Sequence, residues 1–316
     1  MHRRDFMKTP LIAAGSIMIG KAGLVSGLLG SSGMARAAFA AQKAGVPRIA
    51  LNNGMSIPQL GLGTWQLAEN TVTSVRAAIE AGYRLFDTAQ IYGNEKEVWQ
   101  GIKQSGIARK DVFITSKIWT SSMRNPPQKD SIDKSIELLG GEYIDLFMIH
   151  WPAKGRIQET WEVMEEYVQK GLIKSIGFSN FNPHHIEALL KYAKIKPVVN
   201  QIEIHPYHTQ EANVAATRNY GIAVESWSPL AQGKVLNDAA IIGIAKKYNK
   251  SAAQTIIRWH IQRGLIVIPR SKNPAHIAEN IKVFDFELSK DDMAAIAKLN
   301  RNERIMPAAD PDSFSW

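Results

Sequence analysis

Four residues whose side chains move protons or hold charge, Asp87, Tyr92, Lys117 and His150, stand at or just beyond the ends of apolar runs. A tyrosine hydroxyl has an ordinary pKa near ~10 and gives up its proton poorly at neutral pH. A neighbouring ammonium favours the tyrosinate and lowers that pKa, and a carboxylate can hold the ammonium in place. Together such residues could carry out acid–base chemistry, although each of them alone is more often a structural ion pair or a packing residue.

The order of apolar runs and helix-like stretches decides where those residues can meet. An opening pair, Arg48–Leu51 and Met55–Ile57, flanks Asn53-Gly54, which is a strong hairpin signal. Eight further strands are expected at Leu60–Gly63, Arg84–Thr88, Val112–Ile118, Ile144–His150, Ser175–Ser179, Val198–Ile204, Ala223–Ser228 and Ile266–Pro269. Helices are expected between them, for example at Val72–Ala81, Ser131–Leu139, Thr160–Lys170, Pro183–Ala193, Glu211–Asn219 and Ala252–Arg263.

Alternation of strands with helices predicts parallel strands that are covered on both faces. Eight such units fit a single-domain α/β fold, a closed (β/α)8 TIM barrel preceded by the N-terminal β-hairpin. The alternative is an open doubly wound sheet, which needs a Gly-x-Gly-x-x-Gly turn after its first strand. The nearest string, Gly61–Gln66, lacks the third glycine. In a barrel, residues at the carboxyl ends of the strands share one face, so the ionisable residues above would meet there.

Five motifs, which keep their order over residues 48–300, resemble those of the aldo-keto reductases. Gly82–Glu95 resembles the first family signature, Lys174–Phe181 the second and Ile268–Ser271 the third. Ile114–Trp119 and Met148–Pro152 resemble the strands that carry the family's lysine and histidine. The spacings from Asp87 to Tyr92, Lys117 and His150 are most similar to those of bacterial members such as the 2,5-diketo-D-gluconate reductases.

The resemblance implies reversible, metal-free reduction of aldehydes and ketones by a nicotinamide cofactor. Asp87, Tyr92, Lys117 and His150 would be the catalytic four. A carbonyl that receives hydride develops alkoxide charge and needs a proton from a nearby acid, here Tyr92. Lys117, held by Asp87, would lower the pKa of the tyrosine, and His150 would donate a hydrogen bond to the carbonyl oxygen.

The resemblance also implies a cofactor site. Ser179, Asn180 and Gln201 match the side chains that hold the nicotinamide carboxamide, and Trp227 stands where the family more often stacks a tyrosine on the nicotinamide ring. The remaining matches would hold the pyrophosphate, the adenosine 2′-phosphate and the adenine, and they are Ser228, Leu230, Arg270, Ser271, Glu279 and Asn280; Lys272 and His276 are expected to contact the 2′-phosphate as well. His276 replaces a usual arginine and grips phosphate less well at neutral pH, so we expect NADPH to be preferred and NADH to be tolerated.

An aromatic pocket is expected over the nicotinamide, lined by Trp65, Tyr92, Trp119, His150 and Trp151. Aromatic walls with two hydrogen-bond donors suit small aldehydes, α-keto compounds and sugar-derived carbonyls. In the family, the C-terminal tail forms part of the substrate wall. Because only 16 residues follow Asn300, we expect an open, permissive pocket.

Residues 1–40 have the order of an export signal. Arg3 and Arg4, followed by Phe6 and Lys8, resemble a twin-arginine motif, and a weakly hydrophobic stretch and small residues follow. We therefore expect a signal segment at 1–40, a barrel domain at 41–316, transit through the twin-arginine translocase and a periplasmic location. The 1–40 segment holds five basic residues and one acid, so it supplies four of the nine net positive charges. The remaining charge is ordinary for a soluble domain, so no nucleic-acid partner is expected.

Other functions are less compatible with the sequence. The chain has no cysteine, which excludes disulfides, thiolate catalysis and Cys-ligated metals. His205-Pro206-Tyr207-His208 with Glu203 could suggest a metal-dependent hydrolase, but the spacing does not bring two imidazoles together, and adjacent His184 and His185 are expected to point apart. No metal is expected. The alternative that stays open is an exported nucleotide-binding sensor that keeps the barrel and turns over slowly; in either case we expect a monomer.

Overall fold

The computed structural model describes residues 45–124, 128–153, 155–307 and 309–314, so the signal expected at 1–40 lies outside the described residues. Eight parallel strands form one sheet in the order β10-β9-β8-β7-β6-β5-β4-β3. A parallel bridge between Leu60 and Val267 joins its two edges, which closes the barrel. The strands are β3 (Leu62–Gly63), β4 (Leu85–Asp87), β5 (Phe113–Ile118), β6 (Leu146–Ile149), β7 (Ile176–Ser179), β8 (Val199–Glu203), β9 (Ala223–Trp227) and β10 (Ile266–Val267). The predicted (β/α)8 fold is confirmed.

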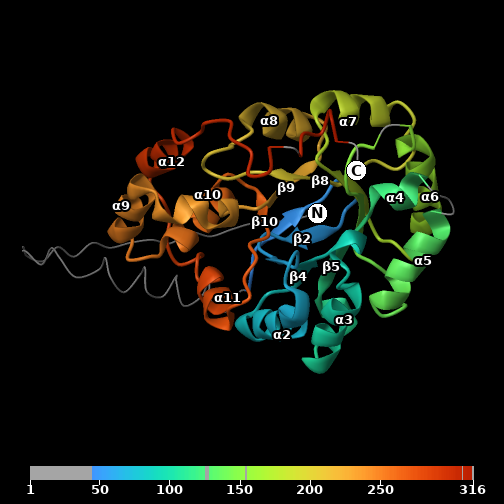
Figure 1. Ribbon diagram of the computed structural model, residues 1–316, viewed down its shortest axis with the longest axis horizontal. Coiled ribbons are helices and arrows are strands. Elements are labelled where there is room, and N and C mark those ends of the chain that lie inside the picture. Colours follow the sequence, from blue (N-terminus) through green and yellow to red (C-terminus); the bar gives the residue numbers. More distant parts are fainter. Residues whose placement is uncertain (1–44, 125–127, 154, 308, 315–316) are drawn as a thin grey trace, which may run out of the picture. The chain divides into compact units, whose positions relative to one another are not determined.

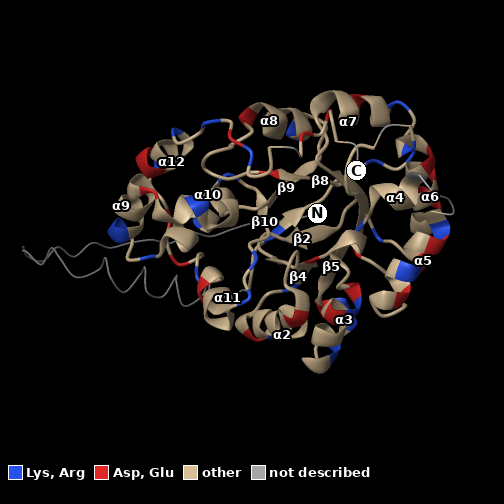
Figure 2. Ribbon diagram, in the orientation of Figure 1, with Lys and Arg blue, Asp and Glu red and all other residues tan. Residues whose placement is uncertain are grey.

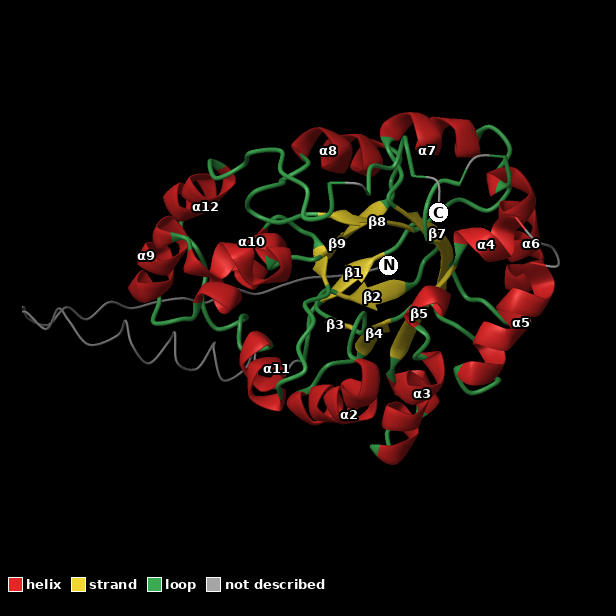
Figure 3. Ribbon diagram, in the orientation of Figure 1, coloured by secondary structure: helices red, strands yellow, loops and turns green. Residues whose placement is uncertain are grey.

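Helices surround the strands (Figures 1 and 3). They are α2 (Thr71–Ala81), α3 (Glu95–Gln104), α4 (Thr120–Arg124), α5 (Gln128–Leu138), α6 (Ile157–Gln169), α7 (Pro183–Leu190), α8 (Glu211–Asn219), α9 (Ala239–Lys247), α10 (Ala252–Gln262), α11 (Pro274–Asn280) and α12 (Lys290–Ala297). Short 3-10 turns are η1 (Ala68–Asn70), η2 (Gln90–Tyr92), η3 (Arg109–Asp111) and η4 (Ala231–Asn237). Charged residues of both signs share the outer helices (Figure 2). Within the described part of the chain, each helix is too short or too polar to cross a membrane.

The predicted hairpin covers the end of the barrel where the strands begin. It consists of β1 (Arg48–Ala50) and β2 (Ser56–Pro58), paired antiparallel. Leu51 and Ile57 belong to the same buried apolar cluster as the first inward residues of several strands. The Asn52 amide donates to the Pro197 carbonyl at 2.8 Å, just before β8. The opposite end, where the strands finish, is therefore left for a site.

Strand alternation sorts the side chains between the barrel interior, here called the lumen, and the helices. On β5, Phe113 packs in the lumen cluster, whereas Ile114 packs with the outer cluster. Lys117 is four residues beyond Phe113 and therefore also faces the lumen. On β9, Ala223 and Trp227 pack against the lumen cluster, which places the intervening Glu225 on the same inward face.

Gly177 in β7 marks a close approach between strands. A Cβ at this position would lie 2.7 Å from the Val199 carbonyl oxygen, which belongs to the backbone of β8 and cannot turn away. We predict that Gly177→Ala lowers the free energy of unfolding by about 1–3 kcal/mol, as overpacking usually does. Gly243→Ala is the control, because a Cβ there meets nothing within 4 Å and alanine favours helix α9. Urea denaturation should separate the two variants, and equal stabilities would contradict the predicted strand contact.

Candidate active site

A buried ion pair lies in the lumen at the carboxyl ends of β4 and β5. The Lys117 Nζ donates to Asp87 Oδ1 at 2.7 Å, to Asp87 Oδ2 at 2.8 Å and to the Thr88 carbonyl at 2.9 Å. All three ammonium protons thus have acceptors. Burial lowers the pKa of Lys117, but the Asp87 carboxylate and Tyr92 outweigh it, so the pKa is raised and the lysine stays charged. The Gln201 Nε2 also donates a hydrogen bond of 2.8 Å to Asp87 Oδ2.

Tyr92 lies over this pair at the end of η2. The Lys117 Nζ is 5.1 Å from the centre of the tyrosine ring. The pKa of Tyr92 is nevertheless raised, because burial raises it more than the Lys117 charge lowers it. From the sequence we expected Lys117 to lower the pKa of Tyr92. Lys117 does act in that direction, but the cost of desolvating the tyrosinate is larger. In this state Tyr92 is a protonated hydroxyl, which is the form that can donate a proton.

His150 follows β6 and faces the same space. Its ring centre is 5.7 Å from that of Tyr92 and 5.1 Å from that of Trp119, in both cases edge to face. Burial, and second the Lys117 charge, hold the pKa of His150 well below its usual range. The imidazole is therefore neutral at physiological pH and can donate one hydrogen bond, while its buried Nδ1 has no partner in the described structure.

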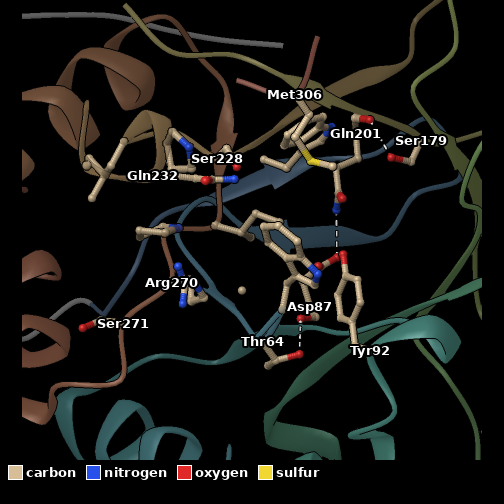
Figure 4. A pocket seen from close by; sticks show the side chains of 18 of the residues that line it. Thr64, Asp87, Tyr92, Ser179, Gln201, Ser228, Gln232, Arg270, Ser271 and Met306 are labelled. Carbon is tan, nitrogen blue, oxygen red and sulfur yellow. Dashed lines mark hydrogen bonds between the residues drawn. The ribbon is translucent and has the colours of Figure 1, made fainter. Parts of the chain in front are cut away.

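These side chains open into a cavity of about 710 Å³. Asp87, Tyr92 and Gln201 lie at one end of it and Arg270 and Ser271 at the other (Figure 4). The cavity contains the predicted substrate residues and all the predicted cofactor residues except Lys272, which is exposed outside its lining. The predicted substrate and cofactor residues that line the cavity are Trp65, Tyr92, Trp119, His150, Trp151, Ser179, Asn180, Gln201, Trp227, Ser228, Leu230, Arg270, Ser271, His276, Glu279 and Asn280.

The middle of the cavity is organised by amide hydrogen bonds. The Asn180 side chain donates to the His150 carbonyl at 3.1 Å and to Ser179 Oγ at 3.0 Å, and it accepts from Trp227 Nε1 at 2.9 Å. The Ser179 hydroxyl donates to the Gln201 carbonyl at 2.8 Å. The indole of Trp227 is thereby fixed with its ring in the cavity wall, where it offers an apolar face.

The residues at the far end fit a dinucleotide phosphate. Ser228 and Gln232 line the cavity with left-handed backbones, at φ values of 48° and 53°, and Gly233 follows at 95°. Such strained non-glycine residues cluster at ligand sites, where the surrounding structure imposes them. Arg270 supplies a permanent positive charge beside Ser271, while Glu279 and Asn280 project from α11. The length of the cavity, its charged end and its aromatic middle together fit NADPH.

Sequence reasoning gave no role to several residues that the structure brings to the site. Glu225 lies in the lumen beside the ion pair and is fully buried, and neither carboxylate oxygen makes a hydrogen bond of normal geometry to another described residue. An acid inside the otherwise apolar run of β9, in phase with Trp227, is the signal that could have revealed it. Thr64, Met306, Ala309 and Phe314 also line the cavity.

The histidines that the sequence offered as candidate metal ligands have other partners in the structure. The His205 Nε2 lies 2.9 Å from Glu203 Oε1 in the buried core. His184 and His185 do not point apart as expected: their ring centres are 4.0 Å apart, and both Nε2 atoms approach Asp312 Oδ1. Their ligand atoms and that of Asp312 lie within 4.8 Å of one another, but none of the three lines the cavity. This histidine pair is therefore separate from the catalytic cluster.

Comparison with known proteins agrees with this geometry. Residues 59–301 match the sequence model of the Aldo/keto reductase family. Glyoxal reductase of Bacillus subtilis is 46% identical over 83% of this chain and 96% of its own length. Methylglyoxal reductase DkgA of Escherichia coli is 44% identical over 84% of this chain and 97% of its own. The crystal structure of a Bombyx mori aldo-keto reductase in complex with NADP superimposes with a TM-score of 0.80, at 36% identity over 86% of this chain and 98% of that one.

Replacing Glu225 by glutamine should increase stability more at pH 8 than at pH 5. Burial, and second the Asp87 carboxylate, raise the pKa of Glu225 to about 8, against about 4.3 for an unfolded glutamate. The folded protein thus keeps a proton that the unfolded chain releases, so wild-type stability falls as pH rises between these values. An amide has no proton to lose. The gain in Tm of Glu225→Gln over wild type should therefore grow by several degrees from pH 5 to pH 8 in scanning calorimetry.

The matched control for that experiment is Glu287→Gln, which changes an exposed glutamate in the same way. Its Tm difference from wild type should stay constant over the same pH range. The comparison between two pH values removes any packing cost of the new amide, because that cost is present at both. A Glu225→Gln difference that does not change with pH would mean that Glu225 is ionised in the folded protein.

Proposed function

The chain belongs to the aldo/keto reductase family and is an NADPH-dependent carbonyl oxidoreductase; we propose that it reduces small α-keto aldehydes and sugar-derived ketones with Tyr92 as the general acid. The observation that carries the proposal is that Asp87, Tyr92 and His150 line one cavity, with Lys117 buried against Asp87 and the Tyr92 ring. The barrel completes this cavity from one chain, which supports our proposal that it works as a monomer.

The side chains of the protein carry out the proton transfer of the reaction. NADPH, held by residues such as Arg270, Ser271 and Trp227, would supply the hydride that the carbonyl carbon receives. The Tyr92 hydroxyl donates its proton to the carbonyl oxygen as negative charge develops there, and the tyrosinate is stabilised by the Lys117 ammonium. The neutral imidazole of His150 donates a hydrogen bond to the same oxygen and fixes its direction. Tyr92 then regains a proton from solvent, and the alcohol leaves.

The substrate class follows from the walls around Tyr92. Trp119 meets the His150 ring edge to face, Trp151 directly follows His150 in the chain, and Trp65 adds a third indole to the cavity lining. Apolar walls around two donors suit a short carbonyl compound with a second oxygen. The names of the relatives, glyoxal reductase and methylglyoxal reductase, support the same class. The alternative of a slow nucleotide sensor has no support among these relatives.

Tyr92→Phe should remove reductase activity and spare cofactor binding. Loss of the Tyr92 hydroxyl above the ion pair is expected to lower kcat by about 10²–10⁴-fold, the usual contribution of a general acid. The assay follows NADPH oxidation at 340 nm with methylglyoxal and is repeated with NADH. NADPH affinity, measured by fluorescence titration, should change less than twofold because the ring remains. Tyr220→Phe, a change of the same kind at an exposed tyrosine, should leave both quantities unchanged.

Full activity in Tyr92→Phe would show that another group delivers the proton. Absence of turnover in the wild-type protein, with either cofactor and across a panel of small carbonyls, would contradict the proposed function itself.

We also propose that residues 1–40 direct export of the folded barrel to the periplasm through the twin-arginine translocase, with separate domains at 1–40 and 41–316. The paired arginines Arg3 and Arg4, the weakly hydrophobic stretch after them and the small residues near Ala37 support this. Glyoxal reductase matches over 96% of its own length yet covers 83% of this chain, so this chain carries sequence that the relative lacks. Because the route carries folded proteins, a bound NADPH would travel inside the barrel.

Replacing Arg3 and Arg4 by lysines tests the export proposal. The double variant should stay in the cytoplasm of a bacterium that has the twin-arginine translocase, because its receptor reads the arginine pair. The Arg36→Lys variant, which keeps the pair and makes the same substitution nearby, should still be exported. Cell fractionation with an antibody against the barrel measures both, and equal periplasmic levels of all variants would refute the proposal.

A further inference from the structure

The first of two attachments of the C-terminal tail is a buried hydrogen bond to Glu203. The backbone N–H of Ile305 donates to Glu203 Oε1, and the same oxygen lies 2.9 Å from His205 Nε2. Glu203 and His205 are each 1% exposed, so this attachment is buried and hard to release. Beyond it, Met306 and Ala309 line the cavity, and Met306 lies over Gln201 in Figure 4. The tail therefore crosses the cavity from a fixed starting point.

A second attachment holds the outer part of the tail to helix α7. Asp312 Oδ1 accepts from Asn182 Nδ2 at 3.0 Å and lies 3.0 Å from His184 Nε2 and 3.5 Å from His185 Nε2. These three residues form the first turn of α7, where the helix dipole also favours a carboxylate. The Asp312 and His184 side chains are 54% and 61% exposed, respectively. Exposed pairs of this kind contribute little, so this attachment can open while the Glu203 attachment holds.

The hydrogen bonds of His185 favour an attachment without a metal ion. The His185 Nδ1 accepts from the Asn182 backbone N–H at 3.1 Å. In the neutral ring the proton is therefore on Nε2, the atom that faces Asp312. A metal ligand needs a bare nitrogen there and usually donates its other ring N–H, which is the reverse arrangement. His185 thus presents its Nε2–H to the Asp312 carboxylate, whose Oδ1 is 3.5 Å away.

The ring two residues beyond Asp312 forms part of the aromatic wall. Phe314 stacks on Trp151 with ring centres 4.0 Å apart and planes 7° apart, and it meets Trp119 edge to face at 6.0 Å. Trp119 in turn meets His150 at 5.1 Å. From the short tail we expected an open pocket. In the structure, however, the tail closes this side of the pocket. It reaches the indoles that flank the catalytic histidine.

We propose that Asp312 is a positioning residue for substrate selection: its attachment to the first turn of α7 holds Phe314 against Trp151, which narrows the pocket for small carbonyls and excludes bulky ones. This inference rests on the proposed reductase function and adds to it the residue that sets substrate size. Release of Asp312 lets Phe314 leave the indole, and the pocket then admits a larger group beside the carbonyl.

Steady-state kinetics with methylglyoxal and phenylglyoxal at saturating NADPH test the proposal. Asp312→Ala should raise the ratio of kcat/KM for phenylglyoxal to kcat/KM for methylglyoxal at least fivefold. The KM for phenylglyoxal should fall and the KM for methylglyoxal should rise, while kcat for methylglyoxal stays within twofold of wild type. Phe314→Ala should raise the same ratio, because it removes the ring itself. Asp312→Glu should restore much of the wild-type ratio, and Ser313→Ala, its neighbour in the tail, should match wild type. An unchanged ratio in Asp312→Ala overturns the proposal.

Hydrogen–deuterium exchange separates this inference from the function on which it rests. Exchange in the C-terminal peptide after Met306 should be faster in Asp312→Ala than in wild type and unchanged in Ser313→Ala. This measurement needs no turnover, so it reports on the attachment even if the wild-type protein reduces neither carbonyl, a result that would count against the reductase function alone. Equal exchange in Asp312→Ala and wild type would show that Asp312 does not hold the tail.

Discussion

The buried ion pair between Asp87 and Lys117 is the interaction on which the rest of the active site depends. Taking two charges out of water costs several kcal/mol per ion unless their partners are well placed. Here the ammonium has three acceptors and the carboxylate gains the Gln201 amide as a further donor. These partners come from β4, β5 and β8, so the strands must keep their register for the pair to exist. The closed barrel, with its lumen plugged by the hairpin, supplies that constraint.

One cation in a dry lumen acts on several groups at once. Lys117 lowers the pKa of Tyr92 against the opposing effect of burial, and it adds to burial in lowering the pKa of His150. The pKa of Glu225 is raised by burial and by Asp87, and Lys117 only partly offsets this. With Glu225 protonated, the Asp87 carboxylate and the Lys117 ammonium balance each other beside it. A protonated tyrosine and a neutral histidine facing one cavity are what a carbonyl oxygen requires as it becomes an alkoxide.

The sequence predicts the barrel well because its signals are local. Apolar runs of strand length, the Asn53-Gly54 turn and the ionisable residues at strand ends all mark positions that the structure keeps. What could not be predicted depends on contacts between distant segments. The adjacency of His184 and His185 gives no sign that both rings approach Asp312, more than 120 residues later. The raised pKa of Tyr92 depends on how deeply the folded barrel buries it, and spacing in the sequence carries no information about that.

The strained backbone around the cavity indicates that the site is arranged before substrate arrives. Asn180 and Ser228 have φ values of 63° and 48°, in a region that costs non-glycine residues of the order of 1–3 kcal/mol each. Asn180 is held there by bonds to His150, Ser179 and Trp227. These bonds join the catalytic histidine to the indole of the cofactor wall, so the strain at Asn180 is offset by the contacts that align the two. The barrel therefore offsets both charge burial and backbone strain before a substrate binds, and the donors of the proposed reaction are already in place.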